Sequence, residues 1–379
     1  MTEFWLVSVP LDKNSAQSVE KLKRSTAKAN LASIFRFPIP ELKVGTLDTL
    51  LAVSDDLSRL DTFAESVMRR TAQCMADVVE HSDKLLENAL ANGVDLASYV
   101  TRFQWDRAKY PTALPLKGLT DIISRQVSQV DGELKTRSAA YNNVKASLEG
   151  LERKAEGCLQ TRALTDIIRK DDLVLNSEYL TTLVVVVCRT SYRLWEQTYE
   201  SLSEFVVPRS SRKIYEEQEG AIFTVTLFKK AVGDFKKNAI KNRFTVREFS
   251  LEEAERQKQE MGRLTVDKKE QYGTFVRWLK VNFSEVFVAW IHLKALRVFT
   301  ESVLRYGLPV SYQVILLQPD RKSVKKLREL LCSLFTHLDT AAAASKPDLG
   351  VDIPGVTTAQ QEYFSYICYS ININLVDPS

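Results

Sequence analysis

The feature that most constrains the fold is a long heptad pattern between Gly118 and Gly157. Apolar residues recur there at alternating steps of four and three, broken at Arg137, namely Ile123, Val127, Val130, Leu134, Tyr141, Val144, Leu148 and Leu151. This seam predicts one continuous helix, and at about 1.5 Å per residue it would be roughly 55 Å long. Because that exceeds the diameter of a compact domain, we expect an elongated molecule. The heptads fit internal packing and the docking of a partner coiled coil equally well.

Before this helix the sequence predicts alternating strands and helices. The strands are identified by β-branched and aromatic residues, and the helices by apolar residues at three- and four-residue steps. We expect a strand at Glu3–Val9, a helix at Ser15–Ala29, an amphipathic helix from Thr46 to Cys74, and a strand at Leu96–Trp105.

The middle of the chain predicts a separate lobe of mixed strands and helices. Leu180–Cys188 is a β-branched run that is too short to span a membrane and is typical of a buried central strand. Further strands are expected at Glu204–Pro208, Ala221–Phe228 and Arg243–Phe249, with helices at Tyr192–Leu202 and Lys229–Asn242.

In the last third of the sequence, the predicted elements lead the chain back to the first lobe. We expect an exposed bridging helix at Leu251–Tyr272, one or two buried helices at Phe275–Tyr306, a strand at Val310–Leu317, a helix at Arg321–Leu338 and a strand at Glu362–Leu375. Because lone strands are unstable, the late strands must join the sheet begun by the early ones.

The predicted fold class is therefore α+β, with two lobes, a head and a foot, joined by a neck of long helices. The foot is built from both chain ends. The predicted boundaries give 1–157 as the first part of the foot with the outgoing helix, 158–262 as the head, and 263–379 as the return helix with the rest of the foot.

Composition narrows the class of protein. The 52 Lys and Arg residues against 48 Asp and Glu give a net charge of +4, too little to coat a nucleic-acid backbone. The five cysteines show no C-x-x-C spacing, so we expect buried, reduced thiols. The early acid Glu3 argues against a signal peptide, and charged residues interrupt the apolar region Tyr272–Leu308. We expect a soluble, cytosolic protein.

Catalytic motifs are missing from the sequence. It contains no G-x-x-x-x-G-K-[ST], G-x-G-x-x-G, H-E-x-x-H or G-x-S-x-G spacing, so we expect neither an active site nor a cofactor. His81, His292 and His337 are far apart and are interpreted as structural rather than metal-binding. The Trp and Phe residues between Phe275 and Phe299 recur at helical spacing and predict core rather than a ligand pocket.

Two basic stretches are the candidate partner contacts. The first stretch contains seven basic residues and a single acidic one, Asp234; the basic residues are Lys229, Lys230, Lys236, Lys237, Lys241, Arg243 and Arg247. The second stretch contains five basic residues, namely Arg321, Lys322, Lys325, Lys326 and Arg328. Each is interpreted either as a solvated helix face or as a surface for an acidic partner. Nucleic-acid binding is disfavoured because we expect neither interleaved exposed aromatic residues nor a Gly-rich recognition loop in either stretch.

Four blocks of sequence carry a family resemblance. They are ELKVGTLDTLLAVSDDLSRLDTFAE (Glu41–Glu65), ANGVDLASYVTRFQWDRAKYP (Ala91–Pro111), VVPRSS (Val206–Ser211) and VRWLKVNFSEVFVAWIHLKALRVFTESVLRYGLPV (Val276–Val310). These blocks closely resemble the C subunits of the vacuolar-type proton-translocating ATPases (V-ATPases) of animals. The similarity extends from Met1 to the tyrosine-rich C-terminal strand, so it covers essentially the whole chain.

The resemblance implies a stator protein without catalytic residues. Members of the family lie where the cytosolic ATP-hydrolysing V1 sector meets the membrane-embedded Vo sector. Their head and foot bind separate peripheral stalks of E and G subunits, and the foot also contacts the cytosolic N-terminal domain of the a subunit. They leave the complex when V1 and Vo separate, which implies regulation of assembly, and some bind actin filaments.

The sequence departs from the more widespread form of this family in the loop Asp12–Ser18 and in the stretch Ser191–Tyr199. These departures imply a tissue-restricted isoform. The main rival interpretation is an actin-binding adaptor protein, for which the first basic stretch would supply the contact.

Overall fold

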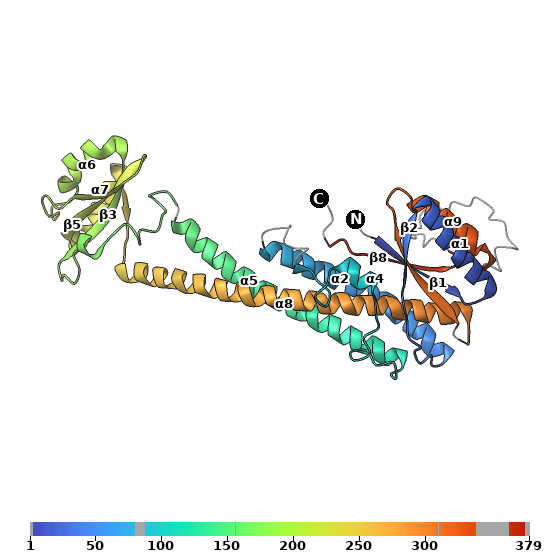
Figure 1. The fold of residues 1–379 in the computed structure, drawn as a ribbon. Coiled ribbons are helices and arrows are strands. Elements are labelled where there is room, and N and C mark those ends of the chain that lie inside the picture. The colour runs from blue at the N-terminus through green and yellow to red at the C-terminus, as the bar shows by residue number, and fades with distance from the viewer. Residues whose placement is uncertain (1–2, 80–87, 156, 310, 339–363, 376–379) are drawn as a thin grey trace, which may run out of the picture. The chain divides into compact units, whose positions relative to one another are not determined.

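The computed structural model describes residues 3–79, 88–155, 157–309, 311–338 and 364–375, and within them the chain forms long helices and two antiparallel sheets (Figure 1). This agrees with the predicted α+β class. The chain divides into two compact units, unit 1 (1–138 and 274–379) and unit 2 (139–273). Both junctions fall inside continuous helices, α5 (Leu116–Ala155) and α8 (Leu251–Tyr306). The boundaries at 157 and 262 remain a prediction.

The sheet of unit 1 is assembled from both chain ends. Its strand order is β2-β7-β1-β8, and all its pairs are antiparallel. The strands are β1 (Glu3–Pro10), β2 (Ala32–Arg36), β7 (Tyr312–Pro319) and β8 (Ile367–Asn372). The prediction that late strands join the early ones is confirmed, whereas the edge strand β2 was not predicted. The predicted ends of two strands, Val310 and Glu362, lie outside the described residues.

Helices cover both faces of this sheet. Helices α1 (Lys13–Ala29) and α9 (Val324–Phe335, continued by η5 at Thr336–Leu338) pack on one face (Figure 1). Helix α8 supports the opposite face, where the Ser8 and Ser302 hydroxyls lie 2.7 Å apart. The segment predicted as a loop, Asp12–Ser18, is instead mostly the start of α1, because Asp12 Oδ1 accepts a bond from the Ser15 N–H and caps the helix.

The rest of unit 1 is built from the long helices α2 (Leu47–Val79), α5 and α8. The heptad residues on α5 between Ile123 and Leu134 are buried, and Glu133 accepts a 3.0 Å bond from the Trp278 indole of α8. The seam in unit 1 is therefore internal packing. Trp290 and the Phe residues of α8 are almost fully buried, which confirms the prediction of core for them, whereas Trp278 is only partly buried. The exposed bridging helix and the buried helices that follow it were predicted as separate elements, but they form the single helix α8 of 56 residues.

Unit 2 has its own sheet, with strand order β4-β5-β3-β6. The strands are β3 (Leu180–Cys188), β4 (Arg212–Glu216), β5 (Gly220–Phe228) and β6 (Thr245–Arg247). Helices α6 (Tyr192–Thr198) and α7 (Val232–Lys241) pack on one face around the buried Trp195. The short helices are η1 (Lys170–Asp172), η2 (Arg189–Ser191), η3 (Tyr199–Leu202) and η4 (Lys229–Ala231).

Three sequence predictions are wrong. The predicted strand Leu96–Trp105 begins as helix α4 (Leu96–Thr101), because Asp95 caps it by accepting a bond from the Ser98 N–H. The predicted strand Glu204–Pro208 makes only a single bridge, between Val206 and Leu227. The thiols are free but not all buried: Cys158, Cys188 and Cys332 are exposed, because they lie in a turn, at a strand end and on the outer side of α9.

His292 is held as a neutral residue in the core of unit 1. Its Nε2 accepts a 2.9 Å bond from the Asp106 N–H, and its Nδ1 lies 2.8 Å from the Val288 carbonyl oxygen. Burial lowers the pKa of His292 from 6.5 to about 4. His337 contacts the Ser15 hydroxyl, and His81 lies outside the described residues.

This burial predicts a loss of stability in mild acid. The unfolded chain binds a proton near pH 6.5 while the folded chain binds it only near pH 4, so stability falls as the pH falls between these values. The loss from this group is at most about 3 kcal/mol. Urea unfolding at several pH values should show it, and in the His292→Asn variant the decline should be shallower. An equal decline in both proteins would contradict the prediction.

Candidate interaction surfaces

Partner surfaces are the main candidate sites in the part of the chain that the structure describes. Within that part, no three His, Cys, Asp or Glu residues cluster closely enough to hold a metal ion. No helix among the same residues is long and apolar enough to cross a membrane.

Three lysines of the first basic stretch are engaged within unit 2. The Lys229 ammonium donates a 2.7 Å bond to the Ser177 carbonyl oxygen. The Lys230 ammonium lies 3.5 Å from the ring centroid of Phe205. The Lys236 ammonium forms an ion pair with Glu248. These three side chains are therefore partly committed to local contacts.

Arg247 also has a local role. Its guanidinium donates to the carbonyl oxygens of Leu159 and Arg162, and so ties β6 to the segment that follows α5. Burial lowers the pKa of this guanidinium. The geometry places Arg247 in the framework of unit 2 rather than on a partner surface.

The cations Lys237, Lys241 and Arg243 remain on the outside. Lys237 and Lys241 project from α7, and Arg243 follows its last turn. Lys237 lies 4.0 Å from Asp234, an exposed pair of little energetic weight. Ile240, between the two lysines, is 70% exposed. This group of three cations around one apolar side chain is the part of the first stretch that faces solvent.

The structure brings exposed aromatic residues beside the first basic stretch, which sequence reasoning missed. Tyr179, Phe205 and Phe228 are all exposed, and the Phe205 and Phe228 rings lie 6.1 Å apart in an edge arrangement. The Lys229 N–H donates to the Tyr179 carbonyl oxygen, and Lys230 covers Phe205. These aromatics are far apart in sequence and are brought together by the pairing of β3 with β5 and by the bridge between Val206 and Leu227, which sequence alone does not reveal.

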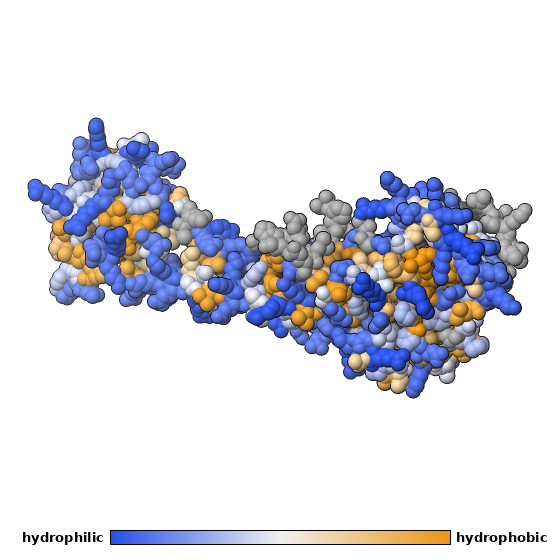
Figure 2. All heavy atoms as spheres, in the orientation of Figure 1, coloured by the Kyte–Doolittle hydropathy of each residue, from blue (hydrophilic) through white to orange (hydrophobic). Residues whose placement is uncertain are grey.

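Figure 2 shows hydrophobic residues gathered in a patch on the visible face of unit 2, with hydrophilic residues around it. Such a mixed surface is typical of contacts that form and separate.

The second basic stretch lies in unit 1, at the start of α9. Lys325 and Lys326 are exposed on its first turn, and Arg321 and Lys322 are exposed in the preceding turn. The Arg328 guanidinium lies 5.3 Å from the Trp5 ring and so packs on the sheet. The two basic stretches thus belong to different units and do not form one site within either unit.

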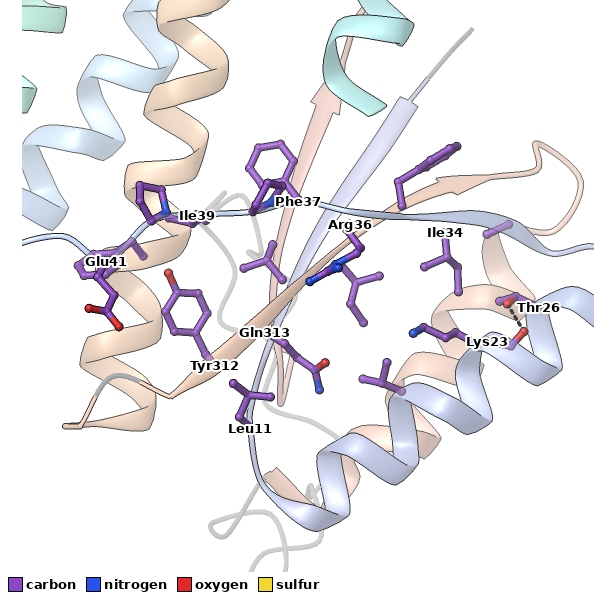
Figure 3. A pocket seen from close by; sticks show the side chains of 18 of the residues that line it. Leu11, Lys23, Thr26, Ile34, Arg36, Phe37, Ile39, Glu41, Tyr312 and Gln313 are labelled. Atoms are coloured by element: carbon purple, nitrogen blue, oxygen red, sulfur yellow. Dashed lines mark hydrogen bonds between the residues drawn. The ribbon is translucent and has the colours of Figure 1, made fainter. Parts of the chain in front are cut away.

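A groove of about 1040 Å³ between α1, β2 and the start of β7 is a further feature of unit 1 (Figure 3). The side chains of Lys23 and Arg36 point into it, and Gln313 lines it near the start of β7. The buried Nε2 atom of Gln313 has no hydrogen-bond partner among the described residues. The walls include Val19 and Ile34. The groove therefore suits an anionic or hydrogen-bond-accepting group attached to an apolar body.

Comparison with known families identifies the chain. Residues 4–367 match the protein family described as the V-ATPase C subunit. The chain belongs to the V-ATPase C subunit family. The match spans both units, from the first strand of the unit 1 sheet to the start of β8.

Vertebrate relatives of this family are similar over their full length. The chain is 58% identical over 381 residues to the C 1-B subunit of the V-type proton ATPase of Danio rerio, and 56% identical over the same length to the C 1 subunit of the V-type proton ATPase of Rattus norvegicus. Each alignment covers 100% of both chains. Membership of a family of ATPase subunits makes the exposed surfaces of both units candidates for contacts inside a larger complex.

Proposed function

We propose that this chain is a non-catalytic stator subunit of the V1 sector of a vacuolar proton-translocating ATPase. The observation that carries the proposal is the full-length similarity to proteins named as C subunits of the V-type proton ATPase. The division into two units, each with its own sheet and core, is compatible with a protein that holds different partners at different places.

In this proposal each unit has its own partners. Unit 2, the head, binds a peripheral stalk of E and G subunits. Unit 1, the foot, binds a second E and G stalk and the N-terminal domain of the membrane a subunit. Helices α5 and α8 form the neck, and they support this assignment because both continue from one unit into the other.

Torque is the physical reason for a two-unit stator. A rotary motor needs a stationary part that resists rotation, and a bridge held by two units resists it better than a single contact, because the second binding event becomes intramolecular. Reversible V1–Vo assembly also requires contacts that can release. Polar, mixed surfaces such as those around α7 and the start of α9 suit that requirement better than large apolar ones.

The proposed location follows from the same role. The protein would lie on the cytosolic face of endomembranes, and of the plasma membrane where the pump operates there, attached through the complex rather than inserted. Its activity would be to support ATP-driven acidification of organelles and of the extracellular space.

Calorimetric titration of the full-length chain into purified E–G stalk heterodimer tests the proposal. We expect saturable, stoichiometric binding that weakens as salt rises. A companion experiment adds the chain to V1 and Vo sectors stripped of their own C subunit and measures ATP-driven proton uptake. Absence of stalk binding together with no effect on proton uptake would overturn the proposed function.

An actin-binding adaptor remains the second candidate, favoured by the exposed cations of α7. Cosedimentation with actin filaments that is abolished by neutralising Lys229, Lys230, Lys236 and Lys237 together would support it. Cosedimentation that those changes leave intact would remove this helix from the account.

A further inference from the structure

The C-terminal end of α7 carries an unusual residue for its backbone geometry. The Phe244 N–H donates a hydrogen bond to the Ala239 carbonyl oxygen, and the Arg243 N–H donates one to the Ile240 carbonyl oxygen. These two hydrogen bonds are the pattern of a Schellman motif. Arg243 occupies the left-handed position of this motif, with φ of 62°. That position is normally taken by glycine, or by asparagine, because a side chain there is strained.

An arginine at this position strains the backbone, and the helix dipole compensates only part of that strain. Left-handed backbone is strained for a non-glycine residue. A cation at a helix C-terminus recovers only part of that strain through its attraction to the helix dipole. Since Lys241 already provides a cation at this helix end, the dipole alone does not explain a second one at the strained position. Strain retained in this way points to a function for the Arg243 side chain.

The neighbouring side chains make this end of the helix a defined surface. We call it the α7 tip, made of Lys237, Ile240, Lys241 and Arg243. Residues 237, 240 and 241 are three and four positions apart and so lie on one face of the helix. Ile240, at 70%, is the most exposed large apolar side chain in the described part of the chain.

Charge around the tip is mainly positive. Neither Lys241 nor Arg243 has an ion-pair partner among the described residues, and Asp234, which is 4.0 Å from Lys237, is the acid closest along the helix. Glu248 is committed to Lys236 at the side of the tip. An exposed apolar residue surrounded by three cations is complementary to a surface with an apolar position flanked by carboxylates.

We propose that the α7 tip docks an acidic amphipathic helix of a partner protein, with Ile240 against the partner's apolar stripe and Lys237, Lys241 and Arg243 paired with its flanking carboxylates. This inference rests on the proposed function, in which the partner of unit 2 is the E–G stalk. It deepens that function by assigning the contact to one end of one helix.

The test compares three variants with two matched controls. Ile240→Glu, Lys241→Glu and Arg243→Gly each change the tip, whereas Val266→Glu and Lys269→Glu make equivalent changes at exposed positions of α8 in the same unit. Each full-length protein is titrated into E–G heterodimer by calorimetry at two salt concentrations. We expect each tip variant to weaken binding roughly tenfold or more, and the controls to bind like the parent.

Arg243→Gly separates binding from folding. Because glycine relieves the left-handed strain, the midpoint of thermal unfolding should stay within about 2 °C of the parent even though binding is weakened. Parental binding by all three tip variants would overturn this inference while leaving the proposed function in place. Failure of the parent protein itself to bind the heterodimer would overturn this inference, and together with no effect on proton uptake it would overturn the proposed function as well.

Discussion

Replacing Asp61 with alanine is expected to reduce the free energy of unfolding of unit 1 by about 3–5 kcal/mol. Asp61 lies on α2 and is 3% exposed. One carboxylate oxygen accepts a 2.9 Å bond from the Lys294 ammonium, and the other accepts a 2.8 Å bond from the Trp290 indole. The Arg297 guanidinium also pairs with it. Without this carboxylate, the 5% exposed Lys294 would remain as an uncompensated buried charge.

The size of this effect comes from the unpaired cation rather than from the lost attraction. Removing one member of a buried pair strands the other, whereas replacing the whole group by apolar residues of similar volume is often neutral. The double variant Asp61→Leu/Lys294→Met should therefore recover much of the loss. It would not recover all of it, since Arg297 and Trp290 still lose a partner.

Urea unfolding together with hydrogen exchange of α2 and α8 measures this prediction. A matched control is Asp56→Ala, which removes an exposed carboxylate of the same helix that lies 2.9 Å from the Lys117 ammonium. That exposed pair is worth about 1 kcal/mol or less. Similar losses for Asp61→Ala and Asp56→Ala would show that the buried network contributes no more than a surface ion pair.

The sequence predicted elements well where one pattern dominated. The run Leu180–Cys188 became β3 with the predicted ends, because continuous β-branched residues suit a strand buried on both faces. The heptads of α5 likewise gave a single helix with a buried seam. In both segments burial and local preference favour the same structure.

Predictions failed where a local contact outweighed the pattern. At Leu96 the aromatic and branched residues favour a strand, but the Asp95 cap starts a helix. Strands β2 and β4 are short edge strands with exposed residues, so their sequences carry little periodicity. Their positions follow from pairing with β7 and β5, which sequence alone does not give.

For the candidate surfaces as well, sequence patterns predicted some features and missed others. Sequence reasoning found the basic residues of α7 because they are close together along the chain. It could not separate Lys236, which pairs with Glu248, from Lys241, which faces solvent. It also missed the left-handed Arg243, because backbone conformation at a single residue leaves no periodic signal.

Replacing Leu134 with proline is expected to abolish ATP-driven proton pumping by complexes reconstituted with the variant, while stalk binding by unit 2 survives. Leu134 lies inside α5, is 5% exposed, and belongs to the buried seam in unit 1. Proline removes the helical bond to the Val130 carbonyl and clashes with it, at a cost of about 3 kcal/mol or more. The core residues of unit 2 lie outside this segment, so its own packing should persist.

The matched control for this change is Leu134→Ala, which removes the same buried side chain but keeps the helix. It is expected to lose about 2–5 kcal/mol of stability through the cavity and yet to retain pumping at a temperature where it is folded. Pumping is measured as ATP-dependent acidification of vesicles, and stalk binding by calorimetry on the same proteins. If α5 acts as a stiff connection between two anchored units, a break in the helix must uncouple them even when both units stay folded. Pumping by the Leu134→Pro complex at the parental rate would therefore contradict the rigid-bridge mechanism, whatever the variant's stability.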